Sequence, residues 1–276
     1  MMQRCCAALA RMRLASLLAL TAIMAAPSAG ICEQPLKAKV GVLRLSSSAP
    51  VFIAQDKGYF RDAGLDIELK FFDAAQPIAV ATTSGDIDFG ITAFTAGLYN
   101  LAGKGTLKVI PLQSLSNAAA ALKGETVDAA LLPASTARKL MDDGGAKLLG
   151  WVGDETPWQL GAVFASTKTL SDKPLVTRLL AALARADREY HDVILAAVSD
   201  GKAPINENTR PLLEIIAKYT NLPVEQVVGN CAYIDPDGRL DVNNVDNQIR
   251  WLQEQGFVDK GFNAEGIIAK DYVKPD

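Results

Sequence analysis

The sequence predicts an α/β protein built around a parallel β-sheet. Short runs with strand-like alternation are separated by helical patterns over residues 37–110, and the loops between them are short. One pattern of helix, turn and buried strand occurs twice. The chain has 276 residues, of which 49% are hydrophobic, enough for one large domain or two smaller lobes.

The N-terminal 30 residues are expected to be a secretory signal peptide. Three arginines precede a short apolar stretch over residues 14–25, and small residues follow it. An uncleaved membrane anchor is the alternative, although the stretch is short for a bilayer span. We expect cleavage between Ala26 and Ile31 and a periplasmic location.

Two cysteines remain after such cleavage. Cys32 follows small residues, as a lipid-modified cysteine would, but Ile31 stands directly before it, where a small residue is required. Lipid anchoring at Cys32 is therefore disfavoured. Both Cys32 and Cys231 are expected to be structural, and whether they pair in an oxidising compartment stays open.

Charge and motifs exclude several classes of function. The 28 basic and 31 acidic residues give a net charge of −3 and are well mixed, so no basic stripe suggests nucleic acid. His191 is the one histidine and lies in an amphipathic helical pattern, where a surface position is favoured over a catalytic one. The motifs CxxC, HExxH, GxSxG and GxxxxGK[ST] are missing from the sequence. We therefore expect no enzyme, no metal and no cofactor.

The expected elements follow from alternation, helical periodicity and turn residues. Val40 and Val42 alternate with other residue types in the first strand, Ser48 and Pro50 are suited to begin the first helix, and Gly58 is suited to end it. Strands are expected at 37–45, 65–73, 87–91, 106–110, 129–132, 146–155 and 161–166. Helices are expected at 48–58, 76–85, 117–122, 173–197, 209–220, 223–231 and 244–256, and a loop followed by a helix at 92–105.

The repeated pattern reads "SGDIDFGITAFTAG" at residues 84–97 and "KGETVDAALLPAST" at residues 123–136. In each copy a glycine ends a helix, acidic residues turn the chain, and an apolar strand leads into a loop. One copy in each lobe is the natural interpretation. Asp86 and Asp88 are not expected to be a catalytic pair, because ligands bind at the other end of such strands.

Four segments resemble a known family: "PVFIAQDKGYFRDAGLDIEL", "SGDIDFGI", "LKGETVDAALLPAS" and "DNQIRWLQEQGFVDKGF". Together they are similar to the periplasmic solute-binding proteins of nitrate/sulfonate/taurine-type ABC importers, a family that includes relatives of the thiamin-pyrimidine synthases. The first segment, residues 50–69, is the most specific. The resemblance implies a two-lobe fold of the type II periplasmic-binding-protein class, with solute held in the cleft and closure reported to a membrane permease.

The chain departs from this family after residue 110. The resemblance implies a strand, a helix and a further strand before the second copy of the pattern, yet Gly85 and Gly124 are only 39 positions apart. A crossover alone takes about 30 residues, so a segment of roughly 50 to 60 residues is expected to be absent. A compact, shortened connection is the alternative. The expected parts are a signal peptide at 1–30, the first part of lobe one at 31–110, a shortened lobe two with the return crossing at 111–165, and a C-terminal helical part packing on both lobes at 166–276.

The candidate ligand-binding residues lie at the carboxyl ends of expected strands and at the helix starts that follow. Hydroxyl groups and backbone N–H groups in such places suit a carboxylate or a sulfonate. Singly, each serine is equally suited to cap a helix, Arg44 to lie on a solvated strand face, and Phe94 to pack in the core. The set is Arg44, Ser46, Ser47, Ser48, Ala49, Gln76, Thr92, Phe94, Thr95, Pro133, Ser135, Trp158 and Gln159.

The leader and the resemblance together imply a non-catalytic extracytoplasmic solute receptor. It would deliver a small organic anion to an ABC permease in the inner membrane, as a monomer and without nucleic acid. A sensory or accessory ligand-binding protein without a permease is one alternative. An enzyme of the pyrimidine-synthase type is another, for which a histidine and cysteine cluster would be expected.

Overall fold

The computed structural model describes residues 34–95, 99, 119–120, 122–125, 127–130, 132–155, 158–199 and 201–272. Apart from Gln34, these residues belong to one compact unit, Pro35–Asp276. The expected signal peptide, Cys32 and the expected strand at 106–110 lie outside the described residues. None of the described helices is both long and apolar enough to cross a membrane.

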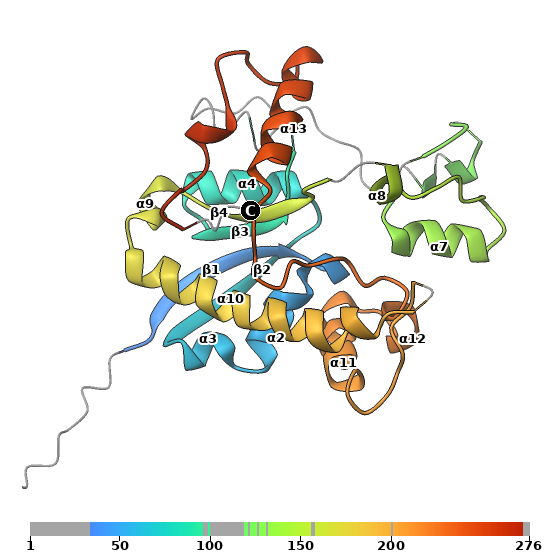
Figure 1. Ribbon diagram of the computed structural model, residues 1–276, viewed down its shortest axis with the longest axis horizontal. Helices are drawn as coiled ribbons and strands as arrows, with labels where there is room; N and C mark the ends of the chain where they lie inside the picture. Colours follow the sequence, from blue (N-terminus) through green and yellow to red (C-terminus); the bar gives the residue numbers. More distant parts are fainter. Residues whose placement is uncertain are drawn as a thin grey trace, which may run out of the picture. The chain divides into compact units, whose positions relative to one another are not determined.

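The central feature is a mixed sheet with the strand order β2-β1-β3-β4 (Figure 1). Strand β1 pairs in parallel with β2 and with β3, which confirms the predicted parallel core. Strand β4 was predicted as a strand, and it lies antiparallel to β3 at one end of the strand order. The strands are β1 (Leu36–Leu43), β2 (Leu65–Phe72), β3 (Phe89–Ala93) and β4 (Gly161–Ala165).

The N-terminal helices agree with the predicted positions. Pro50 lies in the first turn of the first helix, and Gly58, with a left-handed φ of 77°, separates it from the next one. Ser48 holds the N-cap position as expected, but its side chain makes no capping hydrogen bond. The helices are α2 (Ala49–Asp56), α3 (Tyr59–Asp62) and α4 (Ala75–Ser84), preceded by a 3-10 turn at Ser46–Ser48.

The turn between α4 and β3 has the predicted form. Gly85 ends α4 in the left-handed conformation, with φ 84°. The Asp88 backbone N–H donates to the Lys39 carbonyl over 2.9 Å, and the Lys39 N–H donates to Asp88 Oδ2 over 2.8 Å. The Ser84 hydroxyl donates to Asp86 Oδ2 over 2.8 Å. Both acids therefore serve the turn at the amino end of β3.

The second copy of the pattern differs from the prediction. The N–H of Gly124 donates to the Ala120 carbonyl over 2.8 Å, as expected for the end of a helix. However, the described residues among 129–132 form no strand, and 146–151 are irregular up to α8 (Val152–Glu155). Backbone groups of a strand need a neighbouring strand, and the 86% exposure of Leu149 shows that this apolar run is not buried in a sheet.

The remaining helices confirm most of the helical prediction for the C-terminal half. Helices overlap all four segments for which a helical pattern was expected, but only Val224–Val227 of segment 223–231 is helical, and the helices at Ala134–Asp142 and Thr167–Leu170 were not predicted. Their bounds are α7 (Ala134–Asp142), α9 (Thr167–Leu170), α10 (Lys173–Val193), α11 (Arg210–Thr220), α12 (Val224–Val227) and α13 (Val242–Glu254), with 3-10 turns at Leu195–Ala197 and Ala264–Gly266.

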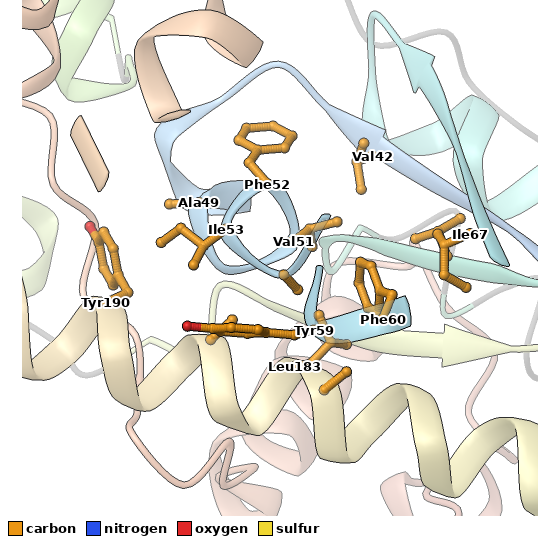
Figure 2. Close-up of a cluster of buried hydrophobic side chains, with 14 of the residues drawn as sticks. Val42, Ala49, Val51, Phe52, Ile53, Tyr59, Phe60, Ile67, Leu183 and Tyr190 are labelled. Atoms are coloured by element: carbon orange, nitrogen blue, oxygen red, sulfur yellow. The ribbon is translucent and has the colours of Figure 1, made fainter. Parts of the chain in front are cut away.

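Helices cover both faces of the sheet. Val42 belongs to the main core with α2, α3 and α10, and Figure 2 shows side chains from these elements gathered in one cluster. The next residue, Leu43, packs instead with Ile78 of α4 and Ile87. Because successive side chains of a strand point to opposite faces, the strand sequence alone accounts for these two layers. A third cluster joins Tyr99 to α13.

Candidate functional site

The candidate site lies along one edge of the sheet, which we call the carboxyl edge. The parallel strands β1, β2 and β3 all end there, and Leu43 is paired with Phe72 at the ends of β1 and β2. Because β4 is antiparallel, its first residue, Gly161, pairs with Ala93 at the end of β3. The carboxyl edge therefore brings residues 158–160 beside the loop that follows β3, as the N–H of Phe94 donating to the Leu160 carbonyl over 2.8 Å confirms.

Two polar side chains of this edge hold atoms that lack hydrogen-bond partners. Gln76 Nε2 and Thr92 Oγ1 are both buried, and neither has a partner among the described residues. The Thr95 hydroxyl donates to Gln76 Oε1 over 3.2 Å, which joins the loop after β3 to the first turn of α4. A buried polar group without a partner costs about 1 to 3 kcal/mol. The two atoms are therefore suited to a ligand that supplies the missing bonds.

The start of α4 at this edge offers further donors, whereas at the start of α2 the Ala49 N–H already donates to the Ser46 carbonyl and Pro50 has no N–H. Neither Ser48 before α2 nor Ala74 before α4 makes a side-chain cap, whereas Asp172 and Asp241 cap α10 and α13. The first N–H groups of a helix have no partner within the helix, and the helix dipole makes that end favourable for negative charge. Ser48 is only 5% exposed and Ala49 is fully buried, so Ser46 and Ser47 are the more accessible of the predicted residues here.

The Arg44 side chain contacts two other residues of the protein, Phe71 and Tyr219. Its guanidinium lies 3.7 Å from the centroid of the Phe71 ring, and its Nη1 donates to the Tyr219 carbonyl over 3.0 Å. These contacts tie the end of β1 to the end of α11. The Arg44 side chain is exposed, which agrees with the alternative prediction of a solvated position. An anion-binding role for Arg44 stays a prediction.

Gln159 is held in place by α13 and its N-terminal cap. Its backbone N–H donates to Asn244 Oδ1 over 2.9 Å, its Nε2 donates to the Gly161 carbonyl over 2.8 Å, and its Oε1 accepts from the Asp241 N–H over 3.3 Å. The adjacent Trp158 is 50% exposed. The Trp158 indole is therefore half exposed beside a glutamine that hydrogen bonds fix in place.

Phe94 takes part in core packing. Its ring stacks on Tyr99, with 5.4 Å between centroids, and Tyr99 contacts Phe262 in turn. Burial raises the pKa of the Tyr99 hydroxyl well above its usual range. The packing alternative for Phe94 is therefore the one that the structure supports.

The two predicted residues after the second copy of the pattern lie at the start of α7. Pro133 holds the N-cap position of this helix, and the side chain of Ser135 lies outside the described part. One turn further along, Arg138 Nε is buried with no partner among the described residues, and the guanidinium carbon lies 5.5 Å from the centroid of the Trp151 ring. Sequence reasoning missed Arg138, although its position in the first turns of a helix after an expected strand was a signal.

Helix α10 carries a carboxyl group with a raised pKa, Asp187, which is not among the predicted site residues. Burial, and next to it the charge of Asp235, raise the pKa of Asp187 to about 7, and Arg188 opposes this shift. His191, in the last turn of the same helix, has its Nδ1 3.1 Å from Asp192 Oδ1. No group of three or more histidine, cysteine, aspartate or glutamate side chains in the described ranges is placed to hold a metal ion.

Comparisons with known proteins agree with this architecture. The profile of the family described as NMT1/THI5 like matches residues 46–147. The alkanesulfonate-binding protein SsuA from Xanthomonas axonopodis pv. citri, solved with bound MOPS, superposes with a TM-score of 0.58 at 17% identity, covering 88% of this chain and 99% of that one. The chain has the fold of the periplasmic solute-binding proteins. The resemblance and the fold class predicted from the sequence are thereby confirmed.

Two further solute-binding structures give the same result. The periplasmic aliphatic sulphonate-binding protein SsuA from Escherichia coli has a TM-score of 0.60 at 15% identity, covering 85% of this chain and 92% of that one. The periplasmic nitrate-binding protein NrtA from Synechocystis PCC 6803 has a TM-score of 0.60 at 12% identity, covering 86% of each chain. Among proteins with curated descriptions, no sequence relative matches.

In this solute-binding fold the carboxyl edge is the candidate site, although a hollow lies elsewhere. A hollow of about 490 Å³ is lined by Lys37, Lys39, Asp66, Glu68 and Asp88, towards the amino ends of β1, β2 and β3. Its three acids outnumber its two lysines, which does not favour an anion, and Asp88 already accepts from the Lys39 backbone N–H. Ligands of open α/β sheets bind outside the carboxyl ends of the strands. We therefore place the candidate site where buried polar atoms lack partners.

Proposed function

We propose that the protein is a non-catalytic extracytoplasmic receptor that binds a small organic anion at the carboxyl edge and delivers it to an ABC importer. The single observation that carries this proposal is the pair of buried atoms, Gln76 Nε2 and Thr92 Oγ1, that lack partners among the described residues at the edge where α4 begins. An amide N–H and a hydroxyl can both donate to an oxyanion.

The donors favour an anion of low charge. The donors are the Gln76 amide, the hydroxyls of Ser46, Ser47 and Thr92, and the N-terminus of α4, and all of them are neutral groups or partial charges. Each helix N-terminus contributes only about 0.3 to 1 kcal/mol when exposed, so several donors must act together. A carboxylate or a sulfonate suits such a set, and the similar structures named above bind sulfonates or nitrate.

The proposal also includes a periplasmic location and a permease partner. Two of the similar structures are described as periplasmic, and a leader with basic, apolar and small-residue regions precedes the described unit. We propose that the receptor acts as a periplasmic monomer that docks on an inner-membrane permease. A sensor with the same fold would bind the same anion without stimulating an ATPase.

A thermal-shift screen tests the proposal. Purified protein is heated with aliphatic and aromatic carboxylates, alkanesulfonates, MOPS and nitrate, each beside an uncharged analogue of the same size. A ligand at 100 times its Kd adds about 2.7 kcal/mol to the free energy of unfolding, which raises the Tm by roughly 5 to 11 °C for a protein of this size. Stabilisation by an anion and not by its uncharged analogue supports the proposal. Equal stabilisation by both, or by none of the anions, contradicts it.

A further inference from the structure

Arg138 of α7 is a cation with no anionic partner among the residues that the structure describes. Its Nε is buried without a hydrogen-bond partner in the part of the chain that the structure describes, and no described carboxylate forms an ion pair with it. Asp142 is four positions further along α7, the spacing at which an ion pair would form on a helix, yet no such pair is made. The cation is therefore left for another partner.

Arg138 contacts one aromatic ring and two glycines. Its guanidinium carbon lies 5.5 Å from the centroid of the Trp151 ring, within the range of a cation–π contact. It also lies close to two glycines: a Cβ built on Gly229 would lie 3.6 Å from Arg138 Nε, and one built on Gly201 would lie 3.7 Å from its Nη2. The two glycines come from turns of the C-terminal part, so this contact connects α7 to that part.

A partly buried guanidinium such as that of Arg138 destabilises the protein unless an anion pairs with it. A partly buried charge without a counter-charge is penalised because it has lost water without gaining a partner. A guanidinium retains several N–H donors in a plane, which match the oxygens of a carboxylate or a sulfonate. At the carboxyl edge, the guanidinium of Arg44 already contacts the Phe71 ring and the Tyr219 carbonyl, whereas Arg138 has no anionic partner among the described residues.

We infer that Arg138, with Trp151 beside it, is the cationic contact for the anionic group of the solute, on the segment expected to form the shortened second lobe. This inference rests on the proposed function and deepens it: the carboxyl edge supplies neutral donors, and α7 supplies the positive charge. The class of solute it selects is a carboxylate or sulfonate monoanion with an organic body.

Calorimetric titration of the full chain tests the inference, with butane-1-sulfonate, benzoate and nitrate as probes and butan-1-ol as the uncharged match. For the probe that binds wild-type protein, Arg138→Gln should raise the Kd at least tenfold, and Arg138→Lys, which retains the charge, should raise it less. Arg210→Gln is the matched control, because Arg210 is exposed on α11 and pairs with Glu214. It should leave the Kd unchanged.

The stability of the free protein separates a binding role from a structural one. Arg138→Met keeps an apolar stem against the two glycines and removes the uncompensated charge, so its Tm should equal or exceed that of wild type. A Tm several degrees lower, together with an unchanged Kd in Arg138→Gln, would show that Arg138 is structural and would overturn the inference.

Tryptophan fluorescence locates the bound anion. Binding beside Arg138 should change the emission of Trp151, so Trp151→Phe should remove most of the ligand-induced change. If the change persists in Trp151→Phe and disappears in Trp158→Phe, the anion lies at the carboxyl edge alone and the inference is wrong, while the proposed function stands. If wild-type protein binds none of the three anions, the proposed function fails and the inference fails with it.

Discussion

The Thr95 hydroxyl donates to Gln76 Oε1 over 3.2 Å, and this bond joins two segments that follow different strands. Gln76 lies in the first turn of α4, after β2, and Thr95 lies in the loop after β3. Because the bond uses the amide oxygen, it orients the amide nitrogen, which is buried and lacks a partner among the described residues. The arrangement presents a donor that is already fixed before a ligand arrives, and such preorganisation lowers the entropic cost of binding.

Gly161→Ala should disturb the pairing of β3 and β4 at the carboxyl edge. A Cβ on Gly161 would lie 2.3 Å from the Thr92 carbonyl oxygen, a backbone atom that cannot turn away. Strands β3 and β4 would have to separate locally, at a cost of about 1 to 3 kcal/mol. We expect a lower Tm and weaker anion binding. Gly150→Ala is the control, because a Cβ there meets nothing within 4 Å, and a normal Tm for Gly161→Ala would contradict the β3–β4 pairing.

Asp187 should make the free energy of unfolding depend on pH. Burial and Asp235 raise its pKa in the folded protein to about 7, above the ordinary 3.8. The folded state therefore holds a proton that the unfolded state releases, so this contribution to stability is lost as the pH rises from about 4 to about 7. Denaturant unfolding at pH 5 and at pH 8 measures it.

Asp187→Asn should reduce this pH dependence and stabilise the protein at pH 8, by an amount on the order of a few kcal/mol. Glu254→Gln, at an exposed position at the end of α13, is the control. An Asp187→Asn variant with the same difference in stability between the two pH values as wild type would show that Asp187 is ionised in the folded protein.

Export should remove the leader between Ala26 and Ile31. The arginines, the apolar stretch and the small residues that follow have the composition that signal peptidase requires. Mass spectrometry of the protein from a periplasmic fraction gives the mature N-terminus directly. A mature chain that retains Met1 would rule out cleavage and favour the membrane-anchor alternative.

The segment between residues 111 and 154 should be the most sensitive to protease. A second lobe that has lost a strand and a helix leaves apolar side chains and backbone groups uncovered, and Leu149 is already 86% exposed. Limited proteolysis with mass mapping should find early cuts there, accompanied by a broad thermal transition. A single sharp transition and full protection of the segment would instead support a compact, adapted connection.

The part of the fold that was predictable from the sequence is the part where local signals agree. In β1, Val40 and Val42 are two positions apart, as strand alternation requires for side chains on one face, and both are fully buried. Gly85 could be recognised as the end of α4 because few other residues adopt its left-handed conformation. The candidate site followed from these boundaries, since the ends of parallel strands share one edge of the sheet.

The features that were missed depend on partners far away in the sequence. The direction of β4 is set by its pairing with β3, to which periodicity gives no clue. Residues 146–151 have a strand-like composition but no neighbouring strand in the described structure. Arg44 is engaged by Tyr219, 175 positions along the chain. Arg138 became a candidate only when its contacts with Gly229 and Trp151 were known.

The central claim is that an anion binds at the carboxyl edge, and calorimetric titration of Thr92→Val tests it most directly. This change keeps the shape of the side chain and removes the hydroxyl that lacks a partner. We predict no loss of stability and a loss of about 1 kcal/mol of binding free energy, roughly fivefold in Kd. Thr83→Val, at an exposed position on α4, should bind as wild type does. A wild-type Kd for Thr92→Val, together with weaker binding when Asp86 is changed to Ala at the opposite end of β3, would contradict the account.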